Sequence, residues 1–228
     1  KSLSNIPKIL FAIIANSTNN HLKYLEFLIK KKVHIYCEKP IFYKKFKYSK
    51  IRNLIKKNKV NFYAGYQLLQ DTKVRYIKDK IKKHKIKSFT ASVGHDFSLW
   101  RKEKLRKKSY FNNTSVGGGV IFELIHEINL ISNLIGNIEK IKTFKTQSEN
   151  HNCEDVAVTI IKIKNNIIGT LYQDMYSKSL FRKIQIITNK INYEIDFAKN
   201  IILENNKKIK FKNSNSQLSL LEKNLRDF

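Results

Sequence analysis

The apolar run at residues 9–15 constrains the fold more than any other segment. It contains no polar side chain, and at this length it is typical of a strand that is buried on both faces of a parallel sheet. A bilayer takes about 20 helical residues to cross, so this run is too short to span one. Residues 16–19 have the polar side chains of a turn and a helix N-cap. Further strands are predicted at 33–37 and 60–64, the second of them after a basic helix at 45–58. This alternation indicates βαβ units and a parallel sheet.

The chain from residue 67 onward has a different pattern. A helix at 71–84, a strand at 86–95, an irregular charged stretch at 97–116 and a helix at 120–135 are followed by strand patterns alone. Those predicted strands are 138–146, 154–164, 167–175, 181–188, 191–197 and 200–211. Asn165-Asn166, Asn189-Lys190 and Asn205-Asn206 are predicted hairpin turns, because asparagine tolerates positive φ. We therefore expect an antiparallel meander, followed by an amphipathic helix from Gln217 to Phe228.

The net charge of +27 is carried almost entirely by lysine. Arginine, whose planar fork suits base recognition, occurs at only six positions, which argues against a sequence-specific nucleic-acid reader. Lysine together with abundant asparagine and isoleucine is the pattern that A/T-rich codons produce, so we interpret the charge as a solvated surface. Nonspecific binding of polyanions through lysine is the alternative.

Cysteine usage and apolar content limit the class of protein further. An apolar content of 42% is that of a globular chain. Cys37 and Cys153 are the only cysteines and form no C-x-x-C pair, so there is no zinc signature and a reducing cytoplasm is expected. No apolar segment is long enough for a membrane helix. We expect a cytoplasmic protein with neither a metal site nor a membrane partner.

Cys37-Glu38-Lys39-Pro40 directly follows the second predicted strand. The carboxyl ends of strands are where open α/β sheets bind their ligands. Pro40 restricts Lys39 to an extended conformation, which directs its ammonium toward such a ligand. A partly desolvated lysine has a lowered pKa and suits acid–base chemistry. The alternative is a strand-terminating turn with an ordinary surface ion pair.

A second candidate segment begins with three glycines, residues 117–119, and leads into the helix predicted at 120–135. Glycine allows the backbone to approach a ligand closely. Glu123 and His126 are three residues apart, which places them on one face of a helix. Histidine titrates near neutrality and can act as a general base. The alternative is a structural histidine on an apolar helix.

The irregular stretch contains Trp100-Arg101 and, further on, Arg106 and Tyr110. An indole face suits a sugar ring, and a guanidinium suits a phosphate or carboxylate. A packed tryptophan with a surface arginine is an equal alternative.

Together, Glu38-Lys39-Pro40 and the glycine segment with Glu123 and His126 resemble the glucose–fructose oxidoreductase / inositol dehydrogenase / MocA (Gfo/Idh/MocA) family. The resemblance extends from residue 9 to about 228. It implies an α/β fold in two domains: residues 1–66 as a truncated, Rossmann-like parallel sheet, and residues 67–228 as an α+β domain with a large, mostly antiparallel sheet. It also implies catalytic roles for Lys39, which would polarise the reacting oxygen, for His126, which would relay its proton, and for Glu123, which would orient both.

The same resemblance implies NAD or NADP as cofactor. The cofactor-binding residues that it implies are Ser17, Asn19, His21, Glu38, Lys39, Pro40 and Gln67. Those implied for the substrate are Trp100, Arg101, Tyr110 and Glu123. The chain departs from the family pattern at Thr18, at Phe122, where many members carry aspartate, and at Leu69 and Asp71-Thr72.

No glycine precedes residue 65, so the G-x-G-x-x-G turn that binds a pyrophosphate is absent from these residues. We therefore expect the chain to lack the N-terminal part of the Rossmann domain and to bind cofactor weakly. The expected function is an NAD(P)-dependent oxidoreductase that interconverts an alcohol and a ketone on a sugar, cyclitol or nucleotide sugar. The alternatives are a cofactor-deficient relative acting as a binding or oligomerisation protein, or a fragment of a longer enzyme. Homo-oligomerisation through the antiparallel sheet is expected, and specific nucleic-acid binding is not.

Overall fold

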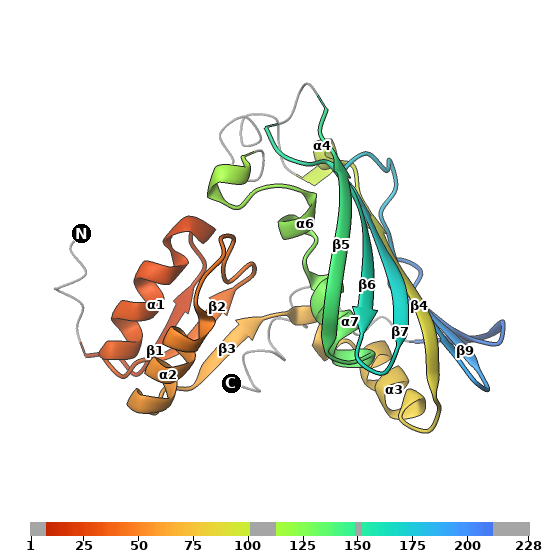
Figure 1. The fold of residues 1–228 in the computed structure, drawn as a ribbon, viewed down its shortest axis with the longest axis horizontal. Coiled ribbons are helices and arrows are strands. Elements are labelled where there is room, and N and C mark those ends of the chain that lie inside the picture. Colours follow the sequence, from red (N-terminus) through yellow and green to blue (C-terminus); the bar gives the residue numbers. More distant parts are fainter. Residues whose placement is uncertain (1–7, 101–112, 149–151, 212–228) are drawn as a thin grey trace.

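A computed structural model describes residues 8–100, 113–148 and 152–211, with the side chain of Trp100 left out. It contains a three-stranded sheet near the N-terminus and a larger, eight-stranded sheet (Figure 1). The predicted class, a parallel sheet followed by an α+β domain with a mostly antiparallel sheet, is confirmed. The helix predicted at 217–228 lies outside the described residues.

The N-terminal sheet consists of β1 (Phe11–Ile14), β2 (His34–Glu38) and β3 (Phe62–Gly65), in the order β1-β2-β3. All its pairs are parallel, as predicted, with Ile14 opposite Cys37 and Glu38 opposite Gly65. A short 3-10 helix, η2 (Thr18–Asn20), and two helices, α1 (His21–Lys30) and α2 (Tyr48–Asn58), connect these strands. The three carboxyl ends therefore lie along one edge of the sheet.

The helices α1 and α2 pack against each other and cover the same face of this sheet. The core beneath them contains Leu25, Ile29, Ile35 and Cys37. The prediction that residues 9–15 are buried on both faces is wrong. Ile14 faces the helices and is buried, whereas Ile13 points to the opposite face and is 53% exposed. Alternate side chains of a strand point to opposite faces, so two helices on one face bury only half of them.

The large sheet has the strand order β11-β10-β9-β8-β4-β7-β6-β5. Its strands are β4 (Ile86–Gly94), β5 (Ile138–Thr146), β6 (Val156–Ile163), β7 (Ile167–Asp174), β8 (Phe181–Thr188), β9 (Asn192–Asp196), β10 (Ile201–Glu204) and β11 (Lys207–Lys210). The predicted meander is interrupted, because β4 lies between β7 and β8 and pairs with β7 in parallel. Sequence patterns did not reveal this insertion, since β4 and β7 are separated by the whole stretch that contains the helices.

Asparagine forms the tight turns of this sheet. Asn165 and Asn166 join β6 to β7, and Asn205 and Asn206 join β10 to β11, all with positive φ. Both turns confirm the sequence prediction and follow from the tolerance of asparagine for this backbone region. The second turn divides the predicted strand 200–211 in two. Asn189 and Lys190 connect the antiparallel strands β8 and β9, as predicted.

The remaining helical elements are η3 (Gln67–Gln70), α3 (Thr72–Ile81), α4 (Phe97–Trp100), η5 (Thr114–Val116), α6 (Val120–Glu123) and α7 (His126–Leu134). The predicted helix 71–84 is α3. The predicted helix 120–135 is interrupted at Leu124, whose φ of −104° and ψ of 36° end α6 before α7 begins. None of the helices in the described ranges is long and apolar enough to cross a membrane.

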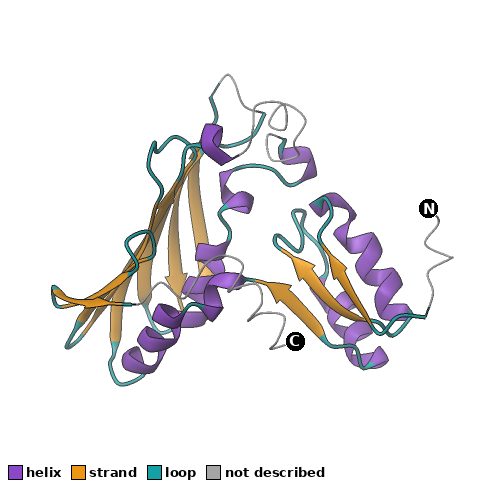
Figure 2. Ribbon diagram, turned by 180° about the vertical axis from the view of Figure 1, so that it is seen from behind, coloured by secondary structure: helices purple, strands orange, loops and turns teal. Residues whose placement is uncertain are grey.

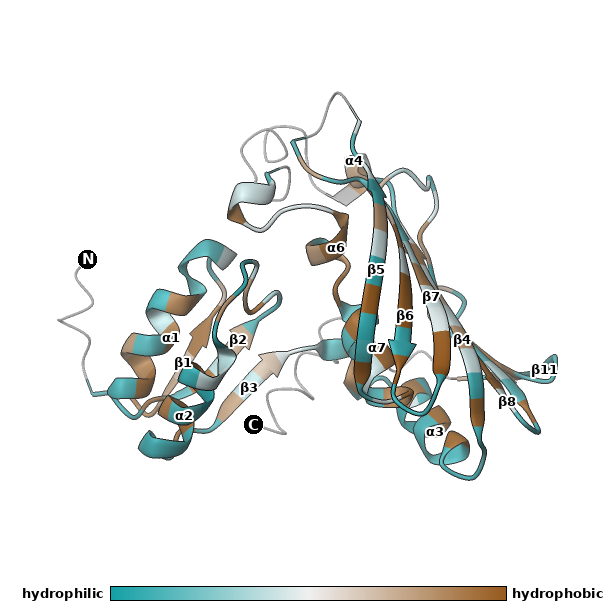
Figure 3. Ribbon diagram, in the orientation of Figure 1, coloured by the Kyte–Doolittle hydropathy of each residue, from teal (hydrophilic) through white to brown (hydrophobic). Residues whose placement is uncertain are grey.

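The helices α3 and α7 cover the face of the large sheet that is turned toward the small sheet (Figures 1 and 2). The core between them is apolar and includes Ile77, Phe89, Leu130, Ile131, Ile161, Leu171, Ile184 and Ile186. Hydrophobic and hydrophilic positions alternate along the strands (Figure 3), as expected of a sheet covered on one face. The packing of α7 on this sheet therefore positions the residues at its N-terminus.

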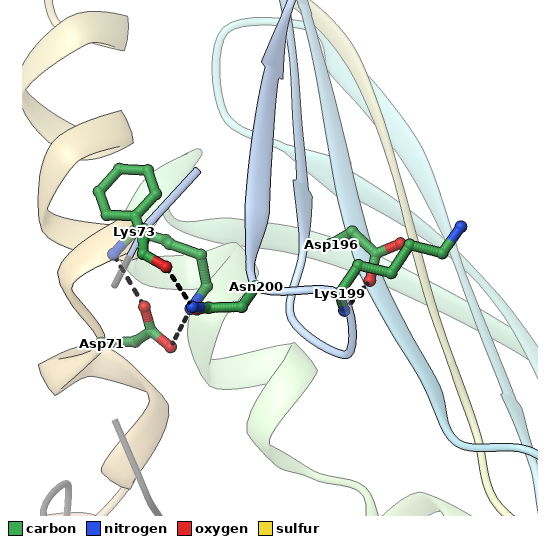
Figure 4. A network of polar contacts seen from close by, with 6 residues as sticks. Asp71, Lys73, Asp196, Lys199 and Asn200 are labelled. Carbon is green, nitrogen blue, oxygen red and sulfur yellow. Dashed lines mark hydrogen bonds and ion pairs between the residues drawn. The ribbon is translucent and has the colours of Figure 1, made fainter. Parts of the chain in front are cut away.

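A buried lysine connects α3 to the β9–β10 turn. Lys73 is almost fully buried, and its ammonium lies 3.0 Å from Asp71 Oδ2 and donates to Asn200 Oδ1 at 2.6 Å (Figure 4). Asp71 is also the N-cap of α3 and accepts a bond from the backbone N–H of Lys73. One carboxylate thus satisfies both a helix end and a buried cation.

We predict that Asp71→Ala destabilises the fold strongly, because it leaves Lys73 without its buried counter-charge and removes the cap. The expected loss in free energy of unfolding is about 3 kcal/mol, measured by urea denaturation. The matched control is Asp79→Ala on the same helix, whose carboxylate forms an exposed ion pair with Lys82. That change should cost less than about 0.5 kcal/mol, and equal losses for the two variants would contradict the prediction.

Candidate active site

Two segments from the different sheets meet where β1 and β2 end. A Cβ atom on Gly117 would lie 2.9 Å from Cβ of Tyr43 and 3.4 Å from Cβ of Thr18. Lys39, in the loop after β2, reaches Glu123 at the end of α6. The glycine segment and the two loops are therefore in direct contact, at the edge of the small sheet where the strands have their carboxyl ends.

Lys39 contacts the segment that leads into α7. Its ammonium donates to the main-chain oxygen of Glu123 at 2.7 Å and lies 4.0 Å from Glu123 Oε2. The side chain keeps 19% of its surface exposed. Burial lowers the pKa of Lys39, and the nearby Arg182 acts in the same direction, while Glu123 and Glu38 oppose the change. Lys39 is thus a partly desolvated acid whose side chain still has some exposed surface for contact with a ligand.

Glu123 and His126 do not lie on one continuous helix, which corrects the sequence expectation. Glu123 is the last residue of α6 and His126 is the first of α7. Glu123 contacts Lys39 directly, and the charge of Lys39 is one of the causes that lower the pKa of His126, after burial. Tyr66, which follows β3, packs edge-on against the His126 ring, with 6.1 Å between ring centroids. The break in the helix therefore assigns the two residues to different elements, of which Glu123 contacts Lys39.

The His126 imidazole is buried, which disfavours its charged form. Burial lowers its pKa well below the usual value, and the positive charges of Lys39 and Arg182 add to the effect. Its Nδ1 and Glu123 Oε1 are buried atoms for which the described residues provide no hydrogen-bond partner. Such atoms are uncommon in folded proteins and mark places where a ligand or water completes the bonding.

The residues expected to bind cofactor divide into two groups. Ser17, which precedes η2, and Asn19, which lies within it, are exposed. His21 is almost fully buried instead, with Nδ1 3.0 Å from the Pro40 carbonyl oxygen and Nε2 2.9 Å from that of Asn16. The histidine joins the loop after β1 to the loop after β2 and has no surface left for a cofactor. His21 therefore has a structural role and holds the two loops together.

Glu38, Pro40 and Gln67 lie around the end of β2. Tyr36 donates to Glu38 Oε1 at 3.2 Å and also interacts with Gln67. Pro40 is buried and follows a cis peptide bond. The partly exposed side chains of Glu38 and Gln67 can therefore contact a bound ring, whereas Pro40 shapes the loop through its backbone.

In the segment of residues 117–119, the backbone packs closely against side chains from other parts of the chain. Gly119 has a φ of +109°, and a Cβ there would collide with the carboxylate of Glu154. Gly117, with a φ of +95°, packs on Tyr43. Any other residue would strain the backbone and push these side chains away.

The expected substrate-binding residues other than Glu123 are not placed. Trp100 is the last residue of α4, but its side chain is not described, and Arg101, Arg106 and Tyr110 lie outside the described residues. Among the described ranges, no group of three or more histidine, cysteine or acidic side chains is arranged to hold a metal ion.

Two charged residues that sequence reasoning did not select also belong to this site. Arg182, at the start of β8, pairs with the buried Glu127 of α7, with 2.7 Å between Nε and Oε1. Arg182 carried no recognisable signal, because it lies 56 positions after His126 in the sequence. Glu127 adjoins His126, but its burial depends on how α7 packs.

Comparisons with solved structures agree with this architecture. The WlbA dehydrogenase from Bordetella pertussis, in complex with NADH and UDP-GlcNAcA, matches with a TM-score of 0.80 and 16% identity over 99% of this chain and 66% of that one. An inositol dehydrogenase homolog from Azotobacter vinelandii, in complex with NAD+, matches with a TM-score of 0.76 and 14% identity over 86% and 54%. Levoglucosan dehydrogenase with NADH matches with a TM-score of 0.77 and 15% identity over 88% and 57%.

At these identities the likeness shows the fold alone, and the chain spans between about half and two thirds of the length of these structures. A search of the curated proteins gave no match. Residues 75–194 match the family model described as the GFO/IDH/MocA C-terminal domain, and this range is more than half of the chain. The chain therefore belongs to the GFO/IDH/MocA family.

Proposed function

We propose that this chain contributes the reacting half of an NAD- or NADP-dependent oxidoreductase that interconverts an alcohol and a ketone on a sugar, cyclitol or nucleotide sugar. The observation that supports the proposal is the contact of Lys39, in the loop after β2, with Glu123, which lies shortly before the buried His126 at the start of α7. A cation, a carboxylate and a buried imidazole thus come from three different elements. That combination suits proton transfer to and from a hydroxyl group.

The residues present fit the nicotinamide half of the cofactor. The buried, unpartnered Nδ1 of His126 and Oε1 of Glu123 indicate that a ligand completes the site. Glu38 and Gln67 offer polar contacts for the nicotinamide ring beside them. When bound, the nicotinamide would supply the hydride chemistry. No G-x-G-x-x-G segment for the pyrophosphate occurs in the 228 residues.

Different residues of the chain donate the hydrogen bond to the substrate oxygen and accept its proton. Lys39, as an ammonium, donates a hydrogen bond to the substrate oxygen and stabilises negative charge that develops there. The neutral His126 accepts the hydroxyl proton during oxidation and returns it during reduction. Glu123 orients Lys39 through its main-chain oxygen and the nearby carboxylate. The substrate hydroxyl would lie between the two nitrogen atoms.

A second copy of the chain is the partner that the large sheet fits best. The outward face of β5, β6 and β7 carries exposed apolar side chains in adjacent positions, with Phe144 opposite Val158 and Val158 opposite Tyr172. Ile160 and Ile168 extend the patch. A contiguous apolar surface of this kind marks an interaction site. We propose that two copies pack these faces together.

The alternative is a cofactor-deficient binding or oligomerisation protein. The absence of a G-x-G-x-x-G turn from these residues favours this alternative. The exposed apolar face of the large sheet is equally consistent with an oligomerisation protein. Cofactor binding and turnover distinguish it from the oxidoreductase.

We predict that the isolated 228-residue chain binds NADH and NADPH weakly and does not discriminate between them. Only the nicotinamide half has a matched surface, so the phosphates would meet scattered lysines alone. Calorimetric titration at low and at moderate salt measures this. Binding should weaken as salt increases, and tight, salt-independent binding of one cofactor would contradict the prediction.

We predict that Lys39→Ala lowers the rate of alcohol oxidation at least ~100-fold, because the acid–base group is lost. The assay follows NADH formation at millimolar NAD+ with a panel of sugars, cyclitols and nucleotide sugars. The exposed Lys31→Ala is the matched control and should retain the full rate. Equal rates for the Lys39 variant and the wild type would remove Lys39 from the mechanism. An inactive wild type across the panel would favour the binding-protein alternative.

We predict that the chain is a dimer and that Val158→Asp with Ile160→Asp produces monomers, since burying two carboxylates without partners is costly. Light scattering coupled to size-exclusion chromatography at moderate salt measures the mass. Tyr48→Asp, on the exposed surface of α2, is the control and should remain dimeric. A monomeric wild type would refute the proposed interface.

A further inference from the structure

Two consecutive main-chain oxygens at the break between α6 and α7 accept hydrogen bonds from side chains. The oxygen of Glu123 accepts from the Lys39 ammonium at 2.7 Å. The oxygen of Leu124 accepts from the Gln173 side-chain amide, with 2.8 Å between Nε2 and the oxygen. Lys39 comes from the loop after β2, whereas Gln173 belongs to β7 in the large sheet. The break is thus held by one donor from each side.

The interruption of the helix explains why Leu124 needs such a donor. Its φ of −104° and ψ of 36° end α6, and the last carbonyl groups of a helix have no partner within that helix. Leu124 is buried, and a buried carbonyl without a partner is costly. The Gln173 amide supplies the donor and also lies 3.4 Å from the main-chain oxygen of Val120.

Gln173 is a polar side chain in apolar surroundings. It is fully buried and pairs with Val93 of β4 and Ala157 of β6. Those two residues share a core with Val120 and Leu124. Its Oε1 has no hydrogen-bond partner in the ranges that the structure describes, which makes the amide unfavourable there. What the amide adds over an apolar side chain of similar size is its hydrogen bond to the break.

We infer that Gln173 is a positioning residue, which holds Leu124 so that the adjoining Glu123 presents its main-chain oxygen to the Lys39 ammonium. The inference rests on the proposed function in taking Lys39 as the acid. Each residue has only two soft backbone dihedrals, so a displaced Leu124 carbonyl displaces the preceding carbonyl with it. Without the Gln173 donor, the break can move and Lys39 loses its acceptor.

Three variants separate this role from simple packing. Gln173→Met keeps the size of the side chain and removes the donor. Gln173→Glu keeps the shape, and because burial raises the pKa of a carboxyl group, the new side chain is neutral and has one O–H donor. Thr159→Val is the matched control: it also makes a buried side chain of this sheet apolar, but it removes a hydrogen bond with Thr143 instead.

The measurement is the rate at which the Lys39 amine of the full chain reacts with trace acetic anhydride at pH 7, followed by peptide mass spectrometry. It needs neither cofactor nor substrate. We expect Lys39 to react about fivefold faster in Gln173→Met, the factor that corresponds to one lost hydrogen bond. A lost acceptor frees the amine and favours its neutral, reactive form. Gln173→Glu and Thr159→Val should stay near the wild-type rate.

Lys73 is the internal reference for an intact fold. Its ammonium is almost fully buried and bound by Asp71 and Asn200, so it reacts only when the fold opens. Its rate should be the same in every variant. If Gln173→Met fails to fold, Gln173→Asn takes its place, because its amide is one methylene too short to reach Leu124. The same acceleration of Lys39 is expected there.

An unchanged Lys39 rate in Gln173→Met would overturn the inference. An equal acceleration in Gln173→Glu or in Thr159→Val would overturn it too, as would a parallel rise for Lys73, because each would show a general loosening of the fold. These outcomes are independent of turnover. A failure of the oxidoreductase proposal would instead appear as an inactive wild-type chain with the predicted labelling differences intact.

Discussion

The packing of α7 against the inner face of the eight-stranded sheet determines where the candidate site is assembled. Leu130, Ile131 and Leu134 are buried in the core formed by β4, β6, β7 and β8. Because these side chains fix the helix, its first residues, His126 and Glu127, are held at the end that faces the small sheet. Burial of apolar area at about 25 cal/mol per Å² is the dominant favourable term in such packing. The position of the chemistry is thus a consequence of the core.

Specific contacts join the small sheet's loops to the segments that pack on the large sheet. The Lys39 ammonium donates to the Glu123 main-chain oxygen, and Gly117 packs on Tyr43. The glycine backbone allows the segment after η5 to approach the loops after β1 and β2, while His21 holds those two loops together. The candidate site is therefore built from segments on both sides, the loops of the small sheet and the helical segment that packs on the large sheet. Small relative movements of the sheets would alter the Lys39–Glu123 contact before they disturbed either core.

Charge is used differently on the surface and in the interior. Most of the lysines that produce the net charge of +27 are solvated, yet Lys39, Lys73 and Arg182 each meet a carboxylate or main-chain oxygen in buried surroundings. Lys73 connects α3 to the β9–β10 turn, whereas Lys39 contacts Glu123 and Arg182 contacts Glu127. A buried cation without such a partner would lower the free energy of unfolding by several kcal/mol. The overall composition therefore says little about the role of any one lysine.

The sequence alone determined the order and type of the elements, because local patterns decide them. The apolar run before Asn16, the asparagine turns and the glycine segment each specify a strand, a hairpin or a close approach through their own side chains. The Lys39 and His126 segments could be selected as candidates through their resemblance to a known family. Tertiary structure alone decided which elements became neighbours: β4 entered the large sheet between β7 and β8, β1 was covered on one face, and the helix at 120–135 was interrupted at Leu124. It also paired Arg182 with Glu127 and turned His21 inward. These outcomes depend on contacts between residues far apart in the chain, whose free energies no local pattern contains.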